Sequence, residues 1–69
     1  MPFVNIRIVR EVLADDPAGK KQRSTDAVQQ AISETTGINS SDIWIVFDEV
    51  AARDWYVGKS SVEALRSAQ

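Results

Sequence analysis

The chain has 69 residues, so it forms at most one domain and buries only about 60% of the surface that its unfolded form exposes. It contains no Cys and no His, which excludes zinc sites built from these ligands, cysteine nucleophiles and histidine bases. Its 8 basic and 10 acidic residues are spread along the sequence, without the basic stripe typical of nucleic-acid-binding proteins. We therefore expect no metal and no nucleic-acid partner.

The short length also predicts self-association. Small domains usually need disulfides, a metal or oligomerisation, and only oligomerisation fits a chain without Cys or His. A hydrophobic content of 43% is consistent with it. No apolar run is long enough to span a bilayer, and no charged and then apolar leader is present, so the sequence predicts a cytoplasmic protein without a membrane partner.

The first predicted element is a strand over residues 3–9, because β-branched residues dominate this stretch and Val4, Ile6 and Ile8 share one face. Pro2 precedes it, and a proline is tolerated as the first residue of a strand. A second interpretation begins with removal of Met1, which would expose the secondary amine of Pro2. A free α-amino group has a pKa of about 7.7–8.0, close enough to neutrality to act as a base.

A helix is predicted next. Residues 10–15 show no clear periodicity, but Asp16 followed by Pro17 is typical of an N-cap and first helical residue. Gly37 is the expected C-cap after Thr36. The apolar stripe at helical spacing consists of Ala27, Val28, Ala31, Ile32 and Thr35.

A second strand is predicted over residues 43–47, apolar on both faces. Strand, helix and strand form a βαβ unit, with parallel strands and a right-handed crossover. One helix covers one face of the sheet, so the other face should meet another subunit. Residues 51–59 indicate a turn and a short aromatic strand or hairpin, and Ser60 and Glu63 have the spacing of a capping box before a helical turn over 62–65. We expect one α+β domain, residues 1–69, made of a βαβ unit with a short C-terminal hairpin.

Four stretches in this order, PFVNIRI, IWIVFDEV, ARD and WYVG, resemble the tautomerase superfamily and its short 4-oxalocrotonate tautomerase type. The resemblance implies a cofactor-independent isomerase in which Pro2 is the catalytic base. Its substrate would be a small anionic 2-oxo or enol acid, in which a proton moves between carbon and oxygen. The implied assembly is a homohexamer, a trimer of dimers.

The resemblance also implies which residues bind the substrate. In the family, arginines hold the carboxylates, a backbone N–H near the end of the first strand contributes, and an aromatic side chain comes from the C-terminal segment. Val9 matches the backbone donor and Trp55 the aromatic residue. The first arginine has a candidate in Arg10, which lies in a longer connection and does not align strictly.

The second family arginine is missing, because Trp44 stands at its position on the second strand. The paired glycines that usually follow the aromatic residue are here Gly58 and Lys59. Lys59 and Arg53 are therefore candidate substitute cations.

Strand geometry limits how these residues combine. Pro2 and Arg10 are eight steps apart, about 26 Å along one strand, too far for one small substrate. An antiparallel neighbour would bring its own Arg10 towards Pro2, so a site that uses Arg10 would be shared between subunits.

Other interpretations of the same residues remain. Arg10 fits a solvated cation, and Trp44 and Trp55 fit an interface core. A non-catalytic oligomeric scaffold of this fold is the alternative function, and Trp44 supports it. The same amine would also suit a related hydration or decarboxylation.

Overall fold

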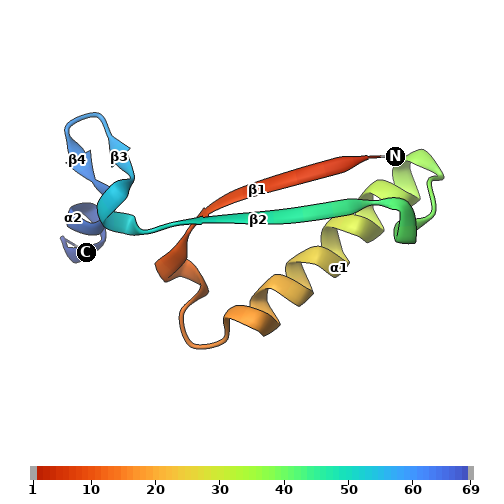
Figure 1. Ribbon diagram of the computed structural model, residues 1–69, viewed down its shortest axis with the longest axis horizontal. Coiled ribbons are helices and arrows are strands. Elements are labelled where there is room, and N and C mark those ends of the chain that lie inside the picture. Colours follow the sequence, from red (N-terminus) through yellow and green to blue (C-terminus); the bar gives the residue numbers. More distant parts are fainter. Residues whose placement is uncertain (1, 69) are drawn as a thin grey trace.

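One strand–helix–strand unit and a small C-terminal segment make up the protein in a computed structural model that describes residues 2–68 (Figure 1). The main elements are β1 (Phe3–Val9), α1 (Pro17–Thr36), β2 (Trp44–Val50), β3 (Tyr56–Val57), β4 (Ser60–Ser61) and α2 (Val62–Ser67). Three single 3₁₀ turns join them: η1 (Arg10–Leu13), η2 (Ser40–Asp42) and η3 (Ala52–Asp54). The predicted α+β class, the βαβ unit and the C-terminal hairpin are confirmed.

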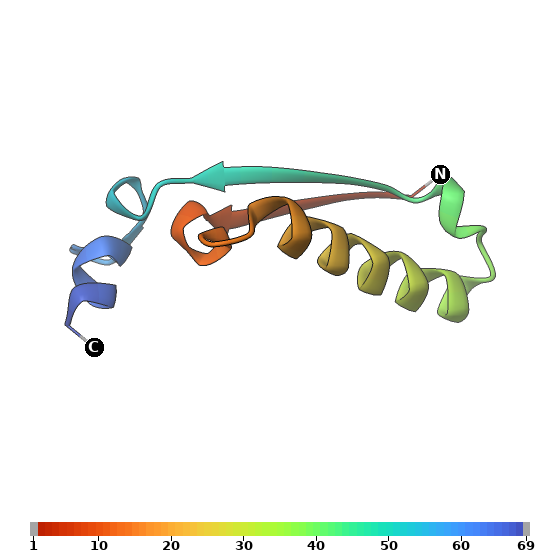
Figure 2. The same ribbon diagram turned by 90° about the horizontal axis from the view of Figure 1, so that it is seen from below.

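The sheet of the βαβ unit consists of β1 and β2, which pair in parallel from Phe3 opposite Trp44 to Val9 opposite Val50. α1 lies along one face of this sheet, and the opposite face is bare (Figure 2). Alternate residues of β1 are half-buried, as expected for a strand with one covered face. The predicted apolar face of β1 is therefore the covered one.

The bare face of the sheet, here called the open face, carries large apolar side chains. Phe3 is 60% exposed, Trp44 57% and Val46 43%. Arg7 and Asp48 lie between the apolar residues and the end of the sheet, and they form an ion pair of 2.9 Å across the two strands. Exposed apolar surface of this kind is typical of a face that another protein surface covers.

α1 begins and ends where the sequence predicts. The Asp16 side chain accepts a hydrogen bond from the Gly19 amide, 3.1 Å, and Gly37 closes the helix with φ of 79° while its N–H donates to the Ser33 carbonyl. Glycine adopts this left-handed conformation more readily than any other residue, which explains where the helix stops.

The predicted apolar stripe of α1 is wrong in part. Val28 and Ile32 are half-buried, but Ala27, Ala31 and Thr35 are exposed. Polar contacts with the sheet explain the difference. The Lys21 ammonium pairs with Glu49 at 2.5 Å, and the Gln29 amide donates to the Ile43 carbonyl at 2.9 Å. These two polar contacts turn the side of α1 that carries Lys21 and Gln29 towards the sheet. A search for apolar residues at helical spacing does not find that side, because both residues are polar.

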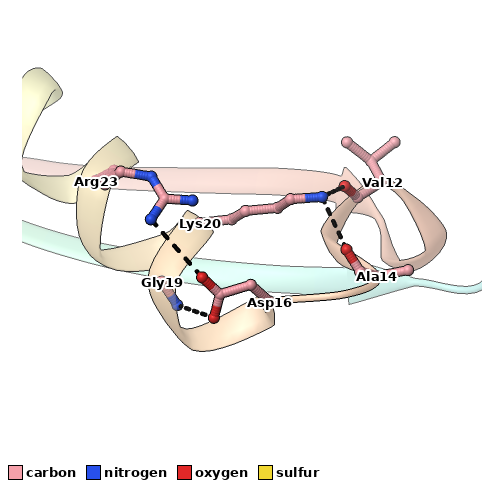
Figure 3. A network of polar contacts seen from close by, with 6 residues as sticks. All are labelled: Val12, Ala14, Asp16, Gly19, Lys20 and Arg23. Atoms are coloured by element: carbon pink, nitrogen blue, oxygen red, sulfur yellow. Dashed lines mark hydrogen bonds and ion pairs between the residues drawn. The ribbon is translucent and has the colours of Figure 1, made fainter.

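The connection between β1 and α1 is ordered by a lysine. Lys20 reaches back from α1 and its Nζ donates to the carbonyls of Val12, 3.1 Å, and Ala14, 2.8 Å (Figure 3). The Arg23 guanidinium lies 3.7 Å from the Asp16 carboxylate that caps the helix. Residues 10–13 form η1, which the sequence did not indicate because a single turn has no periodicity.

Asp15 closes this connection in the left-handed region, with φ of 81°. Aspartate tolerates that conformation better than a β-branched residue. We expect Asp15→Val to lower the free energy of unfolding by about 1–2 kcal/mol, and Asp15→Gly to change it by less than about 1 kcal/mol. Denaturant unfolding of the two variants checks this. Equal stability of Asp15→Val and Asp15→Gly would contradict a backbone cause.

Few residues are fully buried. Among residues 2–68 the buried hydrophobic residues are Leu13, Ile43, Ala51 and Ala52, with exposed fractions of 1–5%. This core is small even for a short chain, because the open face contributes nothing to it. Within residues 2–68, neither helix is both long enough and apolar enough to cross a bilayer.

Candidate active site

Pro2 lies at one end of the sheet. It directly precedes β1, is half-buried, and its carbonyl accepts a hydrogen bond of 3.0 Å from the Trp44 amide at the start of β2. The C-terminal end of α1 lies at this same end of the molecule (Figure 1). The parallel ladder thus fixes the backbone position of the candidate base.

The other candidate residues lie at the opposite end. Val9 is the last residue of β1 and pairs with Val50, the last residue of β2. Arg10 opens η1 directly after β1, and Arg53 lies in η3, shortly after β2. Because the carboxyl ends of parallel strands meet at one edge, the two 3₁₀ turns lie together there. Val9, Arg10 and Arg53 are therefore brought to one end of the fold.

Trp55 belongs to the same end. It is half-buried directly after η3, its N–H donates to the Ala52 carbonyl at 3.4 Å, and its carbonyl accepts from the Val62 amide at 2.7 Å. The last bond ties the start of α2 to Trp55.

Lys59 is exposed in the turn between β3 and β4, next to Gly58 with φ of 63°. The helical turn predicted over 62–65 is confirmed as α2, but Ser61 rather than Ser60 is its N-cap.

The cations divide into two groups. Arg7, Lys20, Lys21 and Arg23 all bond to acidic side chains or backbone carbonyls. By contrast, within residues 2–68 no side-chain hydrogen bond or ion pair is made by the remaining four, which are Arg10, Arg53, Lys59 and Arg66. Arg66 lies in the last turn of α2. We call these four residues the uncommitted cations. Arg10 directly follows β1, and the other three follow β2 in the C-terminal part of the chain.

Glu11 and Arg66 are the residues at this end that the sequence analysis missed. The Glu11 carboxylate accepts a hydrogen bond of 2.8 Å from the Ala52 amide, a contact between η1 and η3. That bond is the main cause that lowers the pKa of Glu11 below its usual 4.5, followed by its own backbone N–H. Burial opposes the shift, and the charges of Arg10 and Arg66 add smaller contributions that lower it. Because residues 11 and 52 are far apart in sequence, no local pattern indicates their contact.

The structure does not bring Pro2 to these residues within one chain. The full length of β1 separates Pro2 from Val9, and the molecule measures 43 × 26 × 17 Å. A hollow lined by polar residues is found elsewhere, along α1 and η2, and it contains none of the candidates; its lining is Asp26, Gln29, Gln30, Ser33, Glu34 and Ser40. One chain alone therefore carries the candidate base and the candidate anion-binding residues at opposite ends.

Comparison with known proteins identifies the family. Residues 2–65 match the family described as "Tautomerase enzyme". The chain belongs to the tautomerase family. It is 35% identical over 66 residues to "Probable tautomerase K2" of Dickeya dadantii (strain 3937), covering 96% of this chain and 94% of that protein. The protein is therefore an isomerase of the tautomerase class.

Solved structures share the fold of this tautomerase over nearly its whole length. DmpI from Helicobacter pylori has a TM-score of 0.82 at 29% identity, with 96% of this chain and 97% of that chain covered. A 4-oxalocrotonate tautomerase isozyme from Methylibium petroleiphilum has a TM-score of 0.78 at 23% identity, with coverage of 93% and 97%. The second likeness supports the fold alone. The resemblance inferred from the sequence is confirmed at the level of family and fold.

Proposed function

We propose that this tautomerase moves a proton between carbon and oxygen in small anionic 2-oxo or enol acids, with the Pro2 amine as the general base. The position of Pro2 at the head of β1, held by the bond from the Trp44 amide to its carbonyl, is the observation that carries this proposal. The match of residues 2–65 to the tautomerase family supports the reaction type. No cofactor is needed, because a neutral amine can both take and return the proton.

The proposal requires that Met1 be removed. Met1 lies outside the described residues. A proline nitrogen inside a peptide bond has no basic lone pair, whereas the free secondary amine would be neutral in part at cellular pH. An apolar side chain supplied by a neighbouring chain, with Trp55 as the candidate, would disfavour the charged form of the amine and keep more of it available as a base.

The uncommitted cations supply the second part of the proposed mechanism. Arg10, with Arg53 and Lys59 as further candidates, would hold the substrate carboxylate. As the amine removes the proton, negative charge develops on the substrate oxygen, and the Val9 backbone N–H is the proposed donor to it. The ammonium form of Pro2 then returns the proton to the other position, so that atoms and charge balance.

Two chains are needed to complete this site. About 26 Å of strand separates Pro2 from Arg10 in one chain, so we propose that an antiparallel neighbour supplies Arg10, together with Val9 and Trp55 from the same end. The open face and the small core support assembly, and a homohexamer built as a trimer of dimers is the proposed form.

We expect the purified protein to be an oligomer at micromolar concentration, with a mass well above the 7.6 kDa of one chain. Light scattering gives the mass. Val46→Asp on the open face should shift the protein to smaller species, because a charge in a covered apolar face is costly. Ala31→Asp is the control, since Ala31 is also exposed but belongs to α1, which covers the opposite face of the sheet (Figure 2). A folded monomer for the unaltered chain would exclude the shared site.

The direct test of the proposed function is turnover of a panel of small 2-oxo and enol acids, with the intact mass measured on the same sample. Tautomerisation by protein that lacks Met1 is the expected result. Protein without Met1 that converts none of these acids would instead favour the oligomeric scaffold. The exposed Trp44 on the open face is the observation that favours that second function.

A further inference from the structure

We propose that Glu11 is a positioning residue for substrate binding: its carboxylate joins the turn that carries Arg10 to the turn that carries Arg53, and so holds both cations at one anion-binding site. This inference rests on the proposed function, because it assumes that these cations bind the substrate carboxylate. Glu11 directly follows Arg10. A negative charge at this position needs an explanation, because it would repel an anionic substrate.

The hydrogen bond between the Glu11 carboxylate and the Ala52 amide, here called the clasp, joins the turns η1 and η3. Glu11 is exposed, but its Oε1 accepts from the amide of Ala52, which is only 1% exposed, at 2.8 Å. Ala52 is the first residue of η3, so its N–H is one of those that a short turn leaves without a partner inside the turn. Within residues 2–68 this is the hydrogen bond that joins the η1 and η3 turns.

The position of Glu11 in the chain explains why it would act on both cations. It directly follows Arg10, and Ala52 directly precedes Arg53. A bond between the Glu11 side chain and the Ala52 backbone therefore fixes the two arginine-bearing residues relative to each other. Lys20 holds the far side of the same connection through the Val12 and Ala14 carbonyls (Figure 3). The Arg10 turn is thus held from two sides, by a carboxylate and by an ammonium.

The carboxylate does not neutralise the cations that it positions. The charges of Arg10 and Arg66 act on Glu11, yet neither arginine forms an ion pair with it within residues 2–68. Its hydrogen-bonding capacity is instead directed to a backbone amide. The guanidinium donors of Arg10 and Arg53 consequently remain available for a substrate.

The test compares three substitutions at residue 11. Glu11→Ala removes the acceptor, Glu11→Asp shortens the side chain by one methylene, and Glu11→Gln keeps an acceptor oxygen at the same reach. We expect Glu11→Ala and Glu11→Asp to raise KM for an enol-acid substrate roughly fivefold to tenfold with kcat within about twofold, because substrate binding weakens while the Pro2 chemistry is unchanged. Glu11→Gln should restore KM to within about twofold of the unaltered enzyme.

Glu63→Ala is the matched control. It removes the same charge from the same end of the protein, and the Glu63 carboxylate makes no hydrogen bond or ion pair within residues 2–68. Its KM should not change. A KM rise of equal size in Glu63→Ala would assign the effect to net charge and overturn the positioning role.

Amide exchange at Ala52 provides a readout independent of turnover. Loss of the acceptor should speed exchange of the Ala52 amide in Glu11→Ala and Glu11→Asp, and not in Glu11→Gln. If Glu11→Ala fails to fold, the comparison of Glu11→Asp with Glu11→Gln decides. Unchanged KM in Glu11→Asp with fast Ala52 exchange would overturn the inference, as would a fall in kcat with KM constant.

Failure of this inference differs from failure of the proposed function. If Arg10→Ala raises KM and Pro2→Ala lowers turnover while Glu11→Asp changes neither constant, only the positioning role is wrong. If Pro2→Ala keeps full turnover, the proposed function is wrong whatever Glu11 does.

The ionisation of Glu11 also gives a stability test with a defined sign. Its pKa is lowered in the folded protein, so its contribution is present above the unfolded value of about 4.5 and is lost as the pH falls through the folded value. The thermal midpoint of the unaltered protein minus that of Glu11→Gln should therefore be constant at neutral pH and shrink below about pH 4.5. A difference that does not vary with pH in this range would show that the charge has no part in the clasp.

Discussion

Replacing Pro2 by alanine is expected to lower turnover of an enol-acid substrate by at least about tenfold, with Met1 absent from both proteins. Alanine keeps a primary amine but changes its basicity and its position relative to β1. An N-terminal extension should have a larger effect, about 10²–10⁴-fold, because it leaves the Pro2 nitrogen inside a peptide bond and removes the base altogether. Steady-state kinetics with intact mass on each sample measures both effects.

The second proline supplies a control for the Pro2 experiment. Pro17 occupies the first position of α1, where its ring favours the helix but has no chemical role in the proposed mechanism. Pro17→Ala should therefore keep kcat while altering stability by a small amount. Full activity in the Pro2→Ala protein, or in the extended protein with its extension confirmed by mass, would remove Pro2 from the mechanism.

Loss of the Arg10 side chain is expected to raise KM roughly tenfold or more, because a charge-assisted bond to a carboxylate contributes about 1.5–3 kcal/mol. The effect should fall mainly on KM, since the contact is made in both the ground state and the transition state. Arg53→Ala and Lys59→Ala should have smaller effects. Arg23→Ala is the control, because the Arg23 guanidinium already lies 3.7 Å from the Asp16 carboxylate (Figure 3) and has no role in the proposed mechanism.

Mixing two impaired variants, assayed at a substrate concentration well below KM, tests whether the site is shared between chains. After subunit exchange of Pro2→Ala with Arg10→Ala, roughly one site in four should combine an intact Pro2 from one chain with an intact Arg10 from another, and activity should rise accordingly. The control replaces Arg10→Ala by the Pro2→Ala/Arg10→Ala double variant, which supplies no intact base. Exchange proven by native mass spectrometry without any gain in activity would refute the shared site.

Local sequence patterns predicted the elements that depend on neighbouring residues. The β1 bounds, the Asp16 cap and the Gly37 stop follow from strand alternation and helix-end chemistry, and the structure has them as expected. The second strand was predicted over 43–47 but spans Trp44–Val50, because the acidic pair after Phe47 concealed its continuation. Asp48 pairs with Arg7 and Glu49 with Lys21, so partners elsewhere in the fold accommodate both charges.

The candidate site was only partly accessible to sequence reasoning. Parallel strands end together, and this predicts that the residues after β1 and β2 lie at one end of the fold: Val9, Arg10, Arg53 and Trp55. The length of β1 predicts their distance from Pro2. Glu11 and Arg66 were missed because their importance depends on a contact between turns remote in sequence and on the placement of α2. The roles of the predicted site residues remain predictions.

The very small set of buried side chains has a consequence for how this enzyme would behave in a cell. In the proposed assembly, copies of the chain would supply much of one another's stability, so the thermal midpoint would depend on protein concentration, as mass action requires. Dilution would then remove folded enzyme as well as assembled enzyme, so specific activity would fall below a threshold abundance. The specific activity of the enzyme would therefore depend on how much of the protein the cell synthesises, without any effector molecule.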